Sequence, residues 1–361
     1  MDYRITLDNA ILMNYPKYTT LNEANKIFVN SKFSECDRLN LYIDATQIIS
    51  SLYTPNVMIV NNYGIISGLI NLCAHLRDYY RRAFSCETRI FIVYSTCMCS
   101  YNIALYPEYF KSFYISKASN SKTDLYILDN IKMLGKLAPY INGVYFVPTN
   151  ADPIVKIADL IMKEQMMMTD MRVPHIIFSK DPYMFMIPSR VDDTFVFKLH
   201  KSRNEYITVC SKENALLEYM RITRREISSN IMSFLMETDS AILGYMLSFI
   251  GVKSRSIKPI KNLSSAVKIL SEHVNLRDPM QIYNLNMEQL YDSVPSLYTK
   301  INKNSFLNRW KCIDLIYQLS LYSNLVEAQS MSYLVDINDP ISVKEINDKY
   351  MVNNPLDLNR L

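Results

Sequence analysis

Short apolar runs alternate with stretches of helical periodicity through the first half of the chain. The runs, rich in Ile, Val, Phe and Tyr, lie near residues 41–44, 89–94, 143–147 and 175–179. Around them, apolar residues recur at the 3.6-residue spacing of an amphipathic helix. Strands that alternate with helices in this way are typical of a parallel sheet with helices on its faces. The pattern predicts an α/β fold with a mainly parallel central sheet flanked by helices.

The second half of the chain has a mostly helical pattern. Residues 191–210 alternate as a hairpin at the edge of a sheet would, and the helical period begins near residue 212. No clean linker separates the halves, so a soft boundary is placed between 190 and 212. We expect an α/β domain over 1–190 and a mostly helical region over 191–361. Helices within the first domain are expected over 47–53, 63–82, 124–138 and 151–168.

A carboxylate follows the first apolar run directly. Asp44 comes after Leu41, Tyr42 and Ile43 and before a helical stretch. A buried parallel strand that ends in this way delivers a carboxylate to the C-terminal edge of the sheet, where α/β proteins bind ligands. An Asp after a strand can equally cap the next helix. The two interpretations are evenly balanced for Asp44 alone.

Composition excludes several classes of protein. The 361 residues include only six glycines, far below the usual frequency of roughly 7%. Phosphate-cradling loops and dinucleotide fingerprints need glycines close together, and none are so placed. No apolar stretch is long enough to span a membrane, and the polar start is not a signal peptide. Seven cysteines without a paired framework suit a reducing compartment, so a cytoplasmic protein is expected.

Six short motifs follow one another in the order and spacing of a known family, although each is weak alone. They are Leu41–Asp44, Gly64–Arg82, Leu105–Tyr109, Asn150–Pro153, Phe178–Asp181 and Ile250–Ile257. Together they resemble the flap endonuclease and 5′-to-3′ exonuclease family, particularly the phage 5′ nucleases of the RNase H type. The resemblance covers about residues 40–315. It implies a PIN-like α/β nuclease fold with a helix–hairpin–helix in the helical region.

The resemblance also implies a metal site, and this chain departs from it. The family uses clustered carboxylates to hold two divalent ions, one activating water and one steadying the leaving oxygen. Asp44, Asp152 and Asp181 stand at such positions and should lie together at the C-terminal edge of the sheet. Other carboxylate positions of the family carry different residues here: Tyr94 or Ser95, Asn150, Pro153, Tyr183, Val252 and Arg255.

Arg255 is the most consequential of these departures. Its guanidinium would bring a fixed positive charge to the place where a cation should sit. We therefore expect no cofactor, and expect Arg255 or a neighbour to brace the remaining aspartates. Under the alternative, those three aspartates hold Mg²⁺ through water, or other carboxylates have taken over as ligands. The candidate substitutes are Glu87, Glu108, Asp159, Asp192 and Asp193.

Basic residues mark the candidate nucleic-acid surface. The family's Gly-x-Gly turn is replaced by a turn without glycine, which carries Lys253, Arg255, Lys258 and Lys261. Lys111 and Lys117 lie in a polar stretch where the family has its arch. The cluster at 253–261 is interpreted either as a solvated loop face or as a patch that contacts a DNA or RNA phosphate backbone. The net charge of +4 permits such contact but does not argue for it.

Two functions from different classes follow. The favoured one is a non-catalytic descendant of a 5′ nuclease that binds nucleic acid or a protein partner, for instance in phage or viral replication or transcription. The other is a working metal-dependent 5′-to-3′ exonuclease or flap endonuclease with a reduced metal site. The first predicts no cleavage with Mg²⁺ or Mn²⁺, and the second predicts cleavage that Asp44→Ala abolishes.

Overall fold

The fold was analysed in a computed structural model of the chain. The structure describes residues 36–45, 142–149, 151–167, 173–179, 181–200, 206–223 and 227–329, and 73–109 without 75, 79, 83 and 96–99. The helices expected over 47–53 and 124–138 lie outside the described residues, as do Lys111 and Lys117. So do the first ten residues of the helix expected over 63–82.

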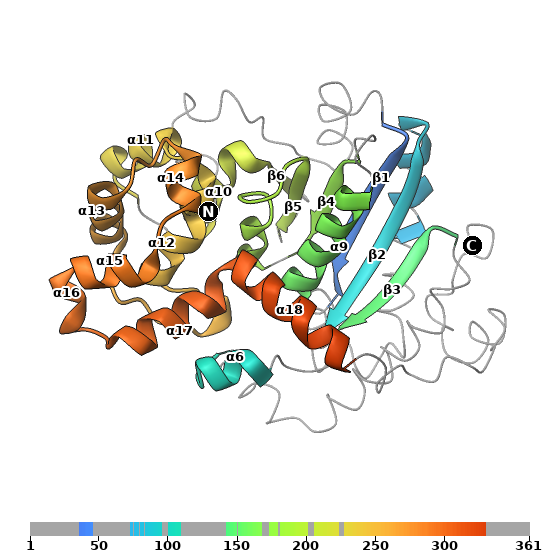
Figure 1. Ribbon diagram of the computed structural model, residues 1–361. Helices are drawn as coiled ribbons and strands as arrows, with labels where there is room; N and C mark the ends of the chain where they lie inside the picture. Colours follow the sequence, from blue (N-terminus) through green and yellow to red (C-terminus); the bar gives the residue numbers. More distant parts are fainter. Residues whose placement is uncertain are drawn as a thin grey trace, which may run out of the picture.

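A six-stranded sheet forms the centre of the molecule (Figure 1). Its spatial order is β3-β2-β1-β4-β5-β6, and every neighbouring pair except the last is parallel. The strands are β1 (Arg38–Asp44), β2 (Glu87–Ser95), β3 (Val144–Thr149), β4 (His175–Phe178), β5 (Thr194–His200) and β6 (Tyr206–Cys210). The predicted α/β fold with a mainly parallel sheet is confirmed.

The apolar runs of β1 and β4 form strands whose two faces are both buried. The four residues of β4 are all buried, and in β1 only Arg38 is not. A strand covered on both faces has a continuous apolar run in its sequence, which is why the sequence located β1 and β4. The run that predicted β3 forms the edge strand instead, and it is only partly buried. The alternating stretch 191–210 forms the hairpin of β5 and β6, which pair antiparallel at the edge. The sheet therefore continues to Cys210, inside the interval where the boundary was placed.

Helices cover the sheet and then form a separate layer beside it. Helix α9 (Pro153–Met167) lies on the sheet with Ile154, Ile157 and Ile161 buried, and α18 (Leu315–Gln329) packs against α9 in front of the sheet (Figure 1). Helical residues between 73 and 84 precede β2. A short helix, α6 (Ser100–Leu105), was not predicted.

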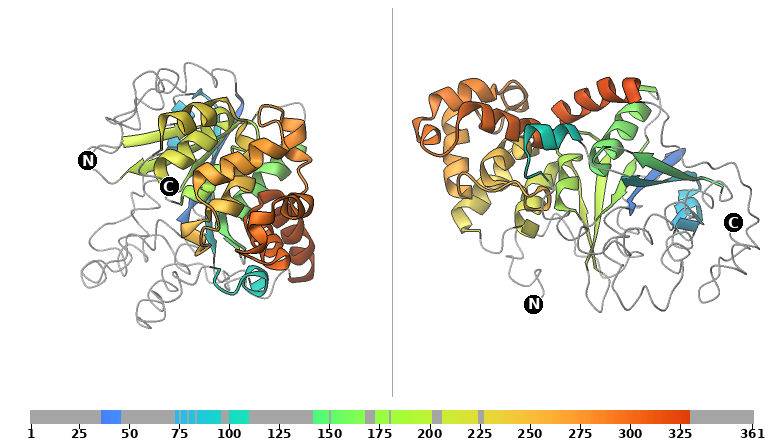
Figure 2. Two further views of the ribbon diagram at one scale, coloured as in Figure 1. Left: turned by 90° about the vertical axis from the view of Figure 1, so that its left-hand side faces the viewer. Right: turned by 90° about the horizontal axis from the view of Figure 1, so that it is seen from below.

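The C-terminal helices gather beside the β5–β6 end of the sheet (Figure 2). They are α10 (Ala215–Thr223), α11 (Ser229–Glu237), α12 (Leu243–Ile250), α13 (Leu263–His273), α14 (Pro279–Tyr283), α15 (Met287–Ser293), α16 (Pro295–Tyr298) and α17 (Lys303–Ile313). One continuous hydrophobic core joins these helices to the sheet, from Tyr42 to Leu319. Within the described residues, no helix is long and apolar enough to cross a membrane.

Three polar side chains on the adjacent strands β1 and β4 form a small buried cluster. The ring of His175 in β4 lies beside Tyr42 in β1, whose hydroxyl is 3.3 Å from Nδ1 of the histidine. The amide of Asn40 reaches the same hydroxyl at 3.5 Å. His175 is fully buried, and burial lowers its pKa to about 4. The imidazole is therefore neutral in the folded protein near pH 7.

Candidate functional site

The candidate site lies where the order of the strands reverses. The chain runs from β1 outward to β3, then returns to β4 on the other side of β1, so the switch point falls between β1 and β4. Open α/β sheets bind their ligands at the C-terminal ends of the strands that flank such a point. Asp44 ends β1, and Ser179 and Asp181 follow β4. The strand topology thus places these residues at one edge.

Two of the three aspartates cap the elements that follow them. Asp181 precedes the 3₁₀ helix η2 (Pro182–Met186), and its Oδ1 accepts the backbone N–H of Tyr183 at 3.0 Å. Asp152 precedes α9, and its Oδ1 accepts the N–H of Ile154 at 2.9 Å. Such caps satisfy N–H groups that have no partner inside the helix. One oxygen of each of these two carboxylates therefore serves as a cap.

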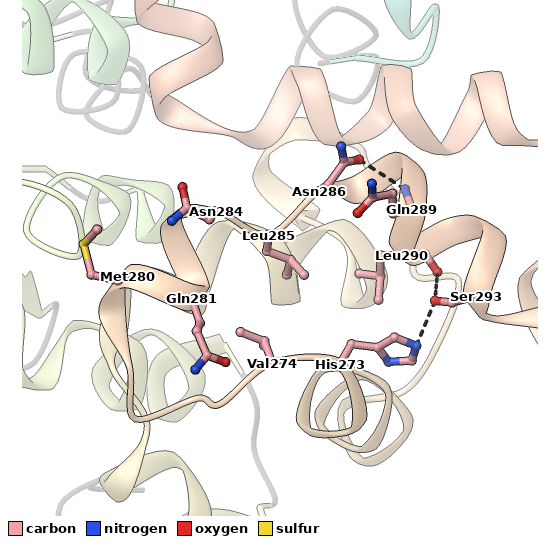
Figure 3. A pocket seen from close by; sticks show the side chains of 10 residues that line it. All are labelled: His273, Val274, Met280, Gln281, Asn284, Leu285, Asn286, Gln289, Leu290 and Ser293. Atoms are coloured by element: carbon pink, nitrogen blue, oxygen red, sulfur yellow. Dashed lines mark hydrogen bonds between the residues drawn. The ribbon is translucent and has the colours of Figure 1, made fainter.

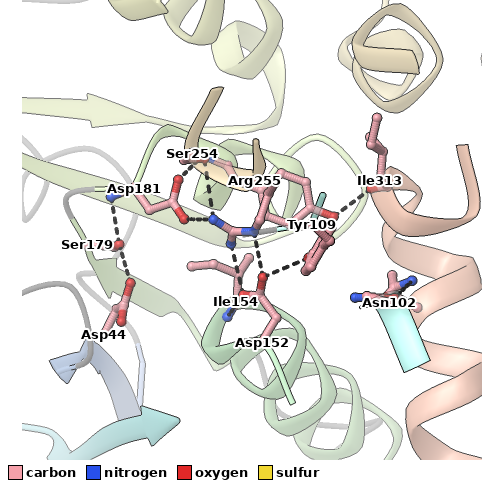
Figure 4. Close-up of polar contacts among 12 residues, drawn as sticks. Asp44, Asn102, Tyr109, Asp152, Ile154, Ser179, Asp181, Ser254, Arg255 and Ile313 are labelled. Carbon is pink, nitrogen blue, oxygen red and sulfur yellow. Dashed lines mark hydrogen bonds and ion pairs between the residues drawn. The ribbon is translucent and has the colours of Figure 1, made fainter. Parts of the chain in front are cut away.

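Arg255 lies between these two carboxylates (Figure 4). Its Nη2 donates to Oδ1 of Asp152 at 2.9 Å, and its Nε lies 2.6 Å from Oδ2. Its Nη1 donates to Oδ2 of Asp181. The guanidinium also lies over the ring of Tyr183, 4.5 Å from the centroid. Arg255 is 1% exposed, so the expected contact between this side chain and the aspartates is present and fully buried.

Asp44 joins the cluster through a hydroxyl. The side chain of Ser179 donates to Oδ2 of Asp44 at 2.7 Å, and the same oxygen of Ser179 accepts the backbone N–H of Asp181 at 3.0 Å. One serine therefore connects the end of β1 to the segment after β4, as Figure 4 shows. Asp44 and Asp181 lie at the same sheet edge and bond to a common atom.

The loop that carries Arg255 is fixed at both ends. Gly251 ends α12 at φ 78°, and a Cβ there would lie 2.4 Å from the carbonyl oxygen of Ile257. Only glycine fits that close approach. Val252 and Ile257 exchange backbone hydrogen bonds, and Ser256 adopts a left-handed conformation between them. The closed loop turns Arg255 inward toward the sheet.

Burial and charge shape the protonation of the cluster. Burial raises the pKa of Asp152, and the guanidinium of Arg255 opposes that rise. Burial alone would lower the pKa of Arg255, but Asp152 and Asp181 raise it well above its ordinary value. Burial likewise raises the pKa values of Tyr109 and Tyr183 well above 10. Arg255 is a permanent cation here, balanced by carboxylates that the protein supplies.

The side chains of this cluster are not arranged to coordinate a pair of divalent ions. The oxygens of Asp152 already accept the N–H of Ile154, the guanidinium and, at 3.3 Å, the hydroxyl of Tyr109. Those of Asp181 accept the N–H of Tyr183 and the guanidinium. Mg²⁺ needs near-octahedral oxygen ligands and loses its water reluctantly, and a guanidinium among the ligands repels it. In the described part of the chain, no three Asp, Glu, His or Cys side chains are grouped so as to hold a metal.

Four of the five candidate substitute carboxylates are paired with basic side chains. Glu87 begins β2, at the opposite end of the sheet, and pairs with Arg38 and Arg89. Asp192 and Asp193 precede β5, also at the opposite end, and Asp192 pairs with Lys212. The remaining two pair with lysines: Asp159 with Lys156 and Lys163, and Glu108 with Lys258.

The basic residues of the 253–261 segment separate into buried and exposed groups. Arg255 points inward, whereas Lys253 and Lys258 are exposed, with 77% of the Lys258 side chain accessible. Lys261 donates to the backbone and hydroxyl oxygens of Ser296. The turn amides are less available than those of a Gly-x-Gly turn. Pro259 has no N–H, and those of Ile260 and Lys261 donate to the carbonyl of Phe249.

A pocket lies among α13, α14 and α15, away from the aspartate cluster (Figure 3). It has a volume of about 450 Å³, an apolar floor that includes Leu285 and Leu290, and a polar rim. Four amide side chains contribute to the rim: Gln281, Asn284, Asn286 and Gln289. All its lining residues are described, and none is Lys, Arg, Asp or Glu. The pocket is therefore lined without formally charged carboxylate, Lys or Arg side chains, and it shares no lining residue with the basic segment 253–261.

Sequence reasoning missed three members of the cluster. Ser179 was read only as part of a motif, although it connects Asp44 to Asp181. Tyr109 and Tyr183 were read as a motif residue and as a lost carboxylate. In the structure, Tyr109 donates to Asp152, and Tyr183 supports the guanidinium while its hydroxyl donates to the carbonyl of Ile313 at 2.6 Å. The available signal was that Ser179 and Tyr109 stand inside two of the motifs and that Tyr183 stands at a carboxylate position of the family.

Solved structures share this arrangement of elements. A pseudo-enzyme form of the bacteriophage T5 flap endonuclease, in complex with DNA and metal ions, matches over 83% of this chain and 96% of its own. The identity is 10% and the TM-score 0.52. The chain has the 5′ nuclease fold. Human GEN1 bound to Holliday junction DNA matches over 87% of this chain and 68% of its own, at 8% identity and a TM-score of 0.45.

Sequence comparison adds no family to this result. No protein-family model matches the chain, and no curated protein matches it. The resemblance drawn from the six motifs is confirmed at the level of the 5′ nuclease fold. Within that fold, the chain places Arg255 between two of the aspartates at the switch point.

Proposed function

We propose that this protein is a catalytically degenerate 5′ nuclease-like protein that acts as a nucleic-acid-binding or protein-interaction subunit. In this proposal it serves phage or viral replication or transcription. The observation that supports this proposal most strongly is the position of Arg255, whose guanidinium contacts both Asp152 and Asp181. Two-metal hydrolysis needs those oxygens for cations. In this protein the same oxygens accept hydrogen bonds from backbone N–H groups and from the Arg255 guanidinium, which stays positively charged.

The exposed lysines supply the proposed contact with nucleic acid. Lys253 and Lys258 lie on the surface of the segment after α12, where the family resemblance expects a phosphate contact. Among the described residues, Lys258 pairs with Glu108 at 3.4 Å, an exposed and weak contact that a phosphate can replace. Arg255 is inaccessible to a backbone phosphate. Binding through these two lysines would show little preference for nucleic-acid sequence and would weaken strongly as the salt concentration rises.

A working nuclease is the second candidate. The observation that favours it is the shared edge, where Asp44, Asp152 and Asp181 all lie near the switch point. For it to act, Arg255 would have to leave the two carboxylates. The full chain can be tested with a labelled flap DNA in Mg²⁺ or Mn²⁺. We expect intact substrate, whereas metal-dependent cutting that disappears in both Asp44→Ala and Asp181→Ala would establish the nuclease.

The same preparation tests the binding surface. We expect Lys253→Ala/Lys258→Ala to weaken binding of the labelled DNA at every sequence tried. The slope of log K against log salt should fall in magnitude by about 0.9 for each lost phosphate contact. Lys268→Ala is the matched control, because its side chain is also 77% exposed but lies on α13 outside the segment. Equal weakening by the control variant, or an unchanged slope in the double variant, would contradict this surface.

A further inference from the structure

Two cysteines lie at the starts of the neighbouring strands β1 and β2. Cys36 is half-buried and stands two residues before β1, and Cys86 is buried and stands directly before β2. Both are free thiols. The backbone N–H of Glu87 donates to the carbonyl of Asp37 at 2.9 Å, so the residues just before β1 are hydrogen-bonded to the start of β2. The nuclease-like edge, at the other end of these strands, uses neither cysteine.

The strand register places the two backbones at disulfide distance. Arg38 is the register partner of Glu87, so Cys36 is offset by one residue from the position opposite Cys86. Adjacent strands about 4.8 Å apart and a rise of about 3.3 Å per residue put the two Cα atoms about 6 Å apart. That is a common separation in disulfides.

Local bends interrupt the regular strand geometry beside both cysteines. In perfectly regular strands, this one-residue offset would point the side chains to opposite faces of the sheet. The chain instead bends at Asp37, and Ser85 adopts a left-handed conformation at φ 54°. The two thiols lie within hydrogen-bonding range of each other.

The contact differentiates the two thiols. The hydrogen bond from Cys86 lowers the pKa of Cys36, and the same bond raises the pKa of Cys86. The thiolate is the nucleophilic form of cysteine, and Cys36, the more accessible thiol of the pair, is the one that an oxidant reaches first. Cys86 is the buried partner that can resolve an oxidised Cys36.

We propose that Cys36 and Cys86 are a redox-active pair that a hydroperoxide converts into an intrachain disulfide. The Cys36 thiolate attacks one oxygen of hydrogen peroxide and displaces hydroxide, which takes up a proton and leaves as water, giving a sulfenic acid. The Cys86 thiol then attacks that sulfur, loses its proton and displaces a second water. Two thiols are oxidised by two electrons and one peroxide is reduced to two waters. Once Cys36 is a neutral sulfenic acid, the hydrogen bond that held the proton on Cys86 is gone.

The disulfide would link the two ends of the segment that runs from the start of β1 to the start of β2. The loop from residue 37 to residue 85 contains β1 and Asp44, so the disulfide would tether the strand that carries the site. A cross-link of this length restricts the unfolded chain, and we expect the unfolding midpoint to rise by several degrees. In a reducing compartment such bonds are transient and respond to oxidant.

The test treats the full-length chain with hydrogen peroxide under native conditions. We expect a mass loss of two hydrogen atoms, a Cys36–Cys86 linked peptide, a raised unfolding midpoint, and reversal of all three by a reductant. Cys86→Ser should instead accumulate a sulfenic acid on Cys36 that dimedone traps. Cys312→Ser is the control, since that buried thiol bonds to the carbonyl of Asn102 and should leave the link unchanged.

The peptide map of the wild-type protein tests the proposal even if the variants fail to fold. A dimedone adduct on Cys36 of the wild type without a link to Cys86 would overturn the proposal. A link between Cys36 and any other cysteine would do the same, and so would a protein whose mass does not change.

Discussion

Arg255→Ala should unfold far more easily than the wild type, with a loss of about 3–5 kcal/mol in the free energy of unfolding. The substitution leaves the carboxylates of Asp152 and Asp181 buried beside each other without their cation. Removing one partner of a buried ion pair leaves an uncompensated charge, which costs more than the pair itself contributed. Urea denaturation followed by circular dichroism measures the change.

Two further variants separate charge from packing. Lys253→Ala removes an exposed cation two residues away on the same loop, and we expect a change below about 0.5 kcal/mol. A triple variant, Arg255→Met with Asp152→Asn and Asp181→Asn, keeps the caps and removes the three charges of the ion pairs. It should recover most of the lost stability. A triple variant as unstable as Arg255→Ala would show that shape, not charge, explains the loss.

Acid should destabilise the wild type through His175. Its pKa is about 4 in the folded protein, against about 6.5 when unfolded. The unfolded chain therefore takes up a proton first as pH falls. The contribution is complete above about pH 6.5, shrinks as pH falls toward 4, and amounts to about 2 kcal/mol of lost stability by pH 5.

His175→Gln isolates this effect. The other titrating groups are common to both proteins, so the difference in pH dependence belongs to residue 175. Urea midpoints at pH 7.5 and pH 5 should fall more steeply for the wild type than for the variant. Parallel curves would mean that His175 takes up its proton without cost, contrary to its burial among Tyr42 and Asn40.

The sequence located the sheet because buried parallel strands are continuous apolar runs. The strands around Leu41, Ile92 and Ile176 are buried on both faces, so each was visible without tertiary information. Helix α6 was not visible. It is six residues long, and its position depends on Asn102, whose amide exchanges two hydrogen bonds with Gln318 at 2.9 Å each. A contact between residues so far apart in the chain leaves no periodic signal.

The site was predictable as a set of positions but not as a set of bonds. Asp44 and Asp181 were located because they follow strands, and Asp152 because it begins a helix. The sequence could not show that Ser179 connects two of them or that Tyr109 bonds to Asp152. It also could not show that Cys36 meets Cys86, because that contact depends on the register of β1 and β2 and on bends before each strand.

The metal response of the wild-type protein tests the central claim most directly. A ligand that binds only the folded state raises the unfolding midpoint in proportion to the logarithm of its concentration. Because Arg255 occupies the carboxylates, the midpoint should not change with millimolar Mg²⁺ or Mn²⁺ at constant ionic strength. A midpoint that rises with either ion, and no longer does so in Asp181→Asn, would show that the cluster binds metal despite Arg255 and would contradict the account.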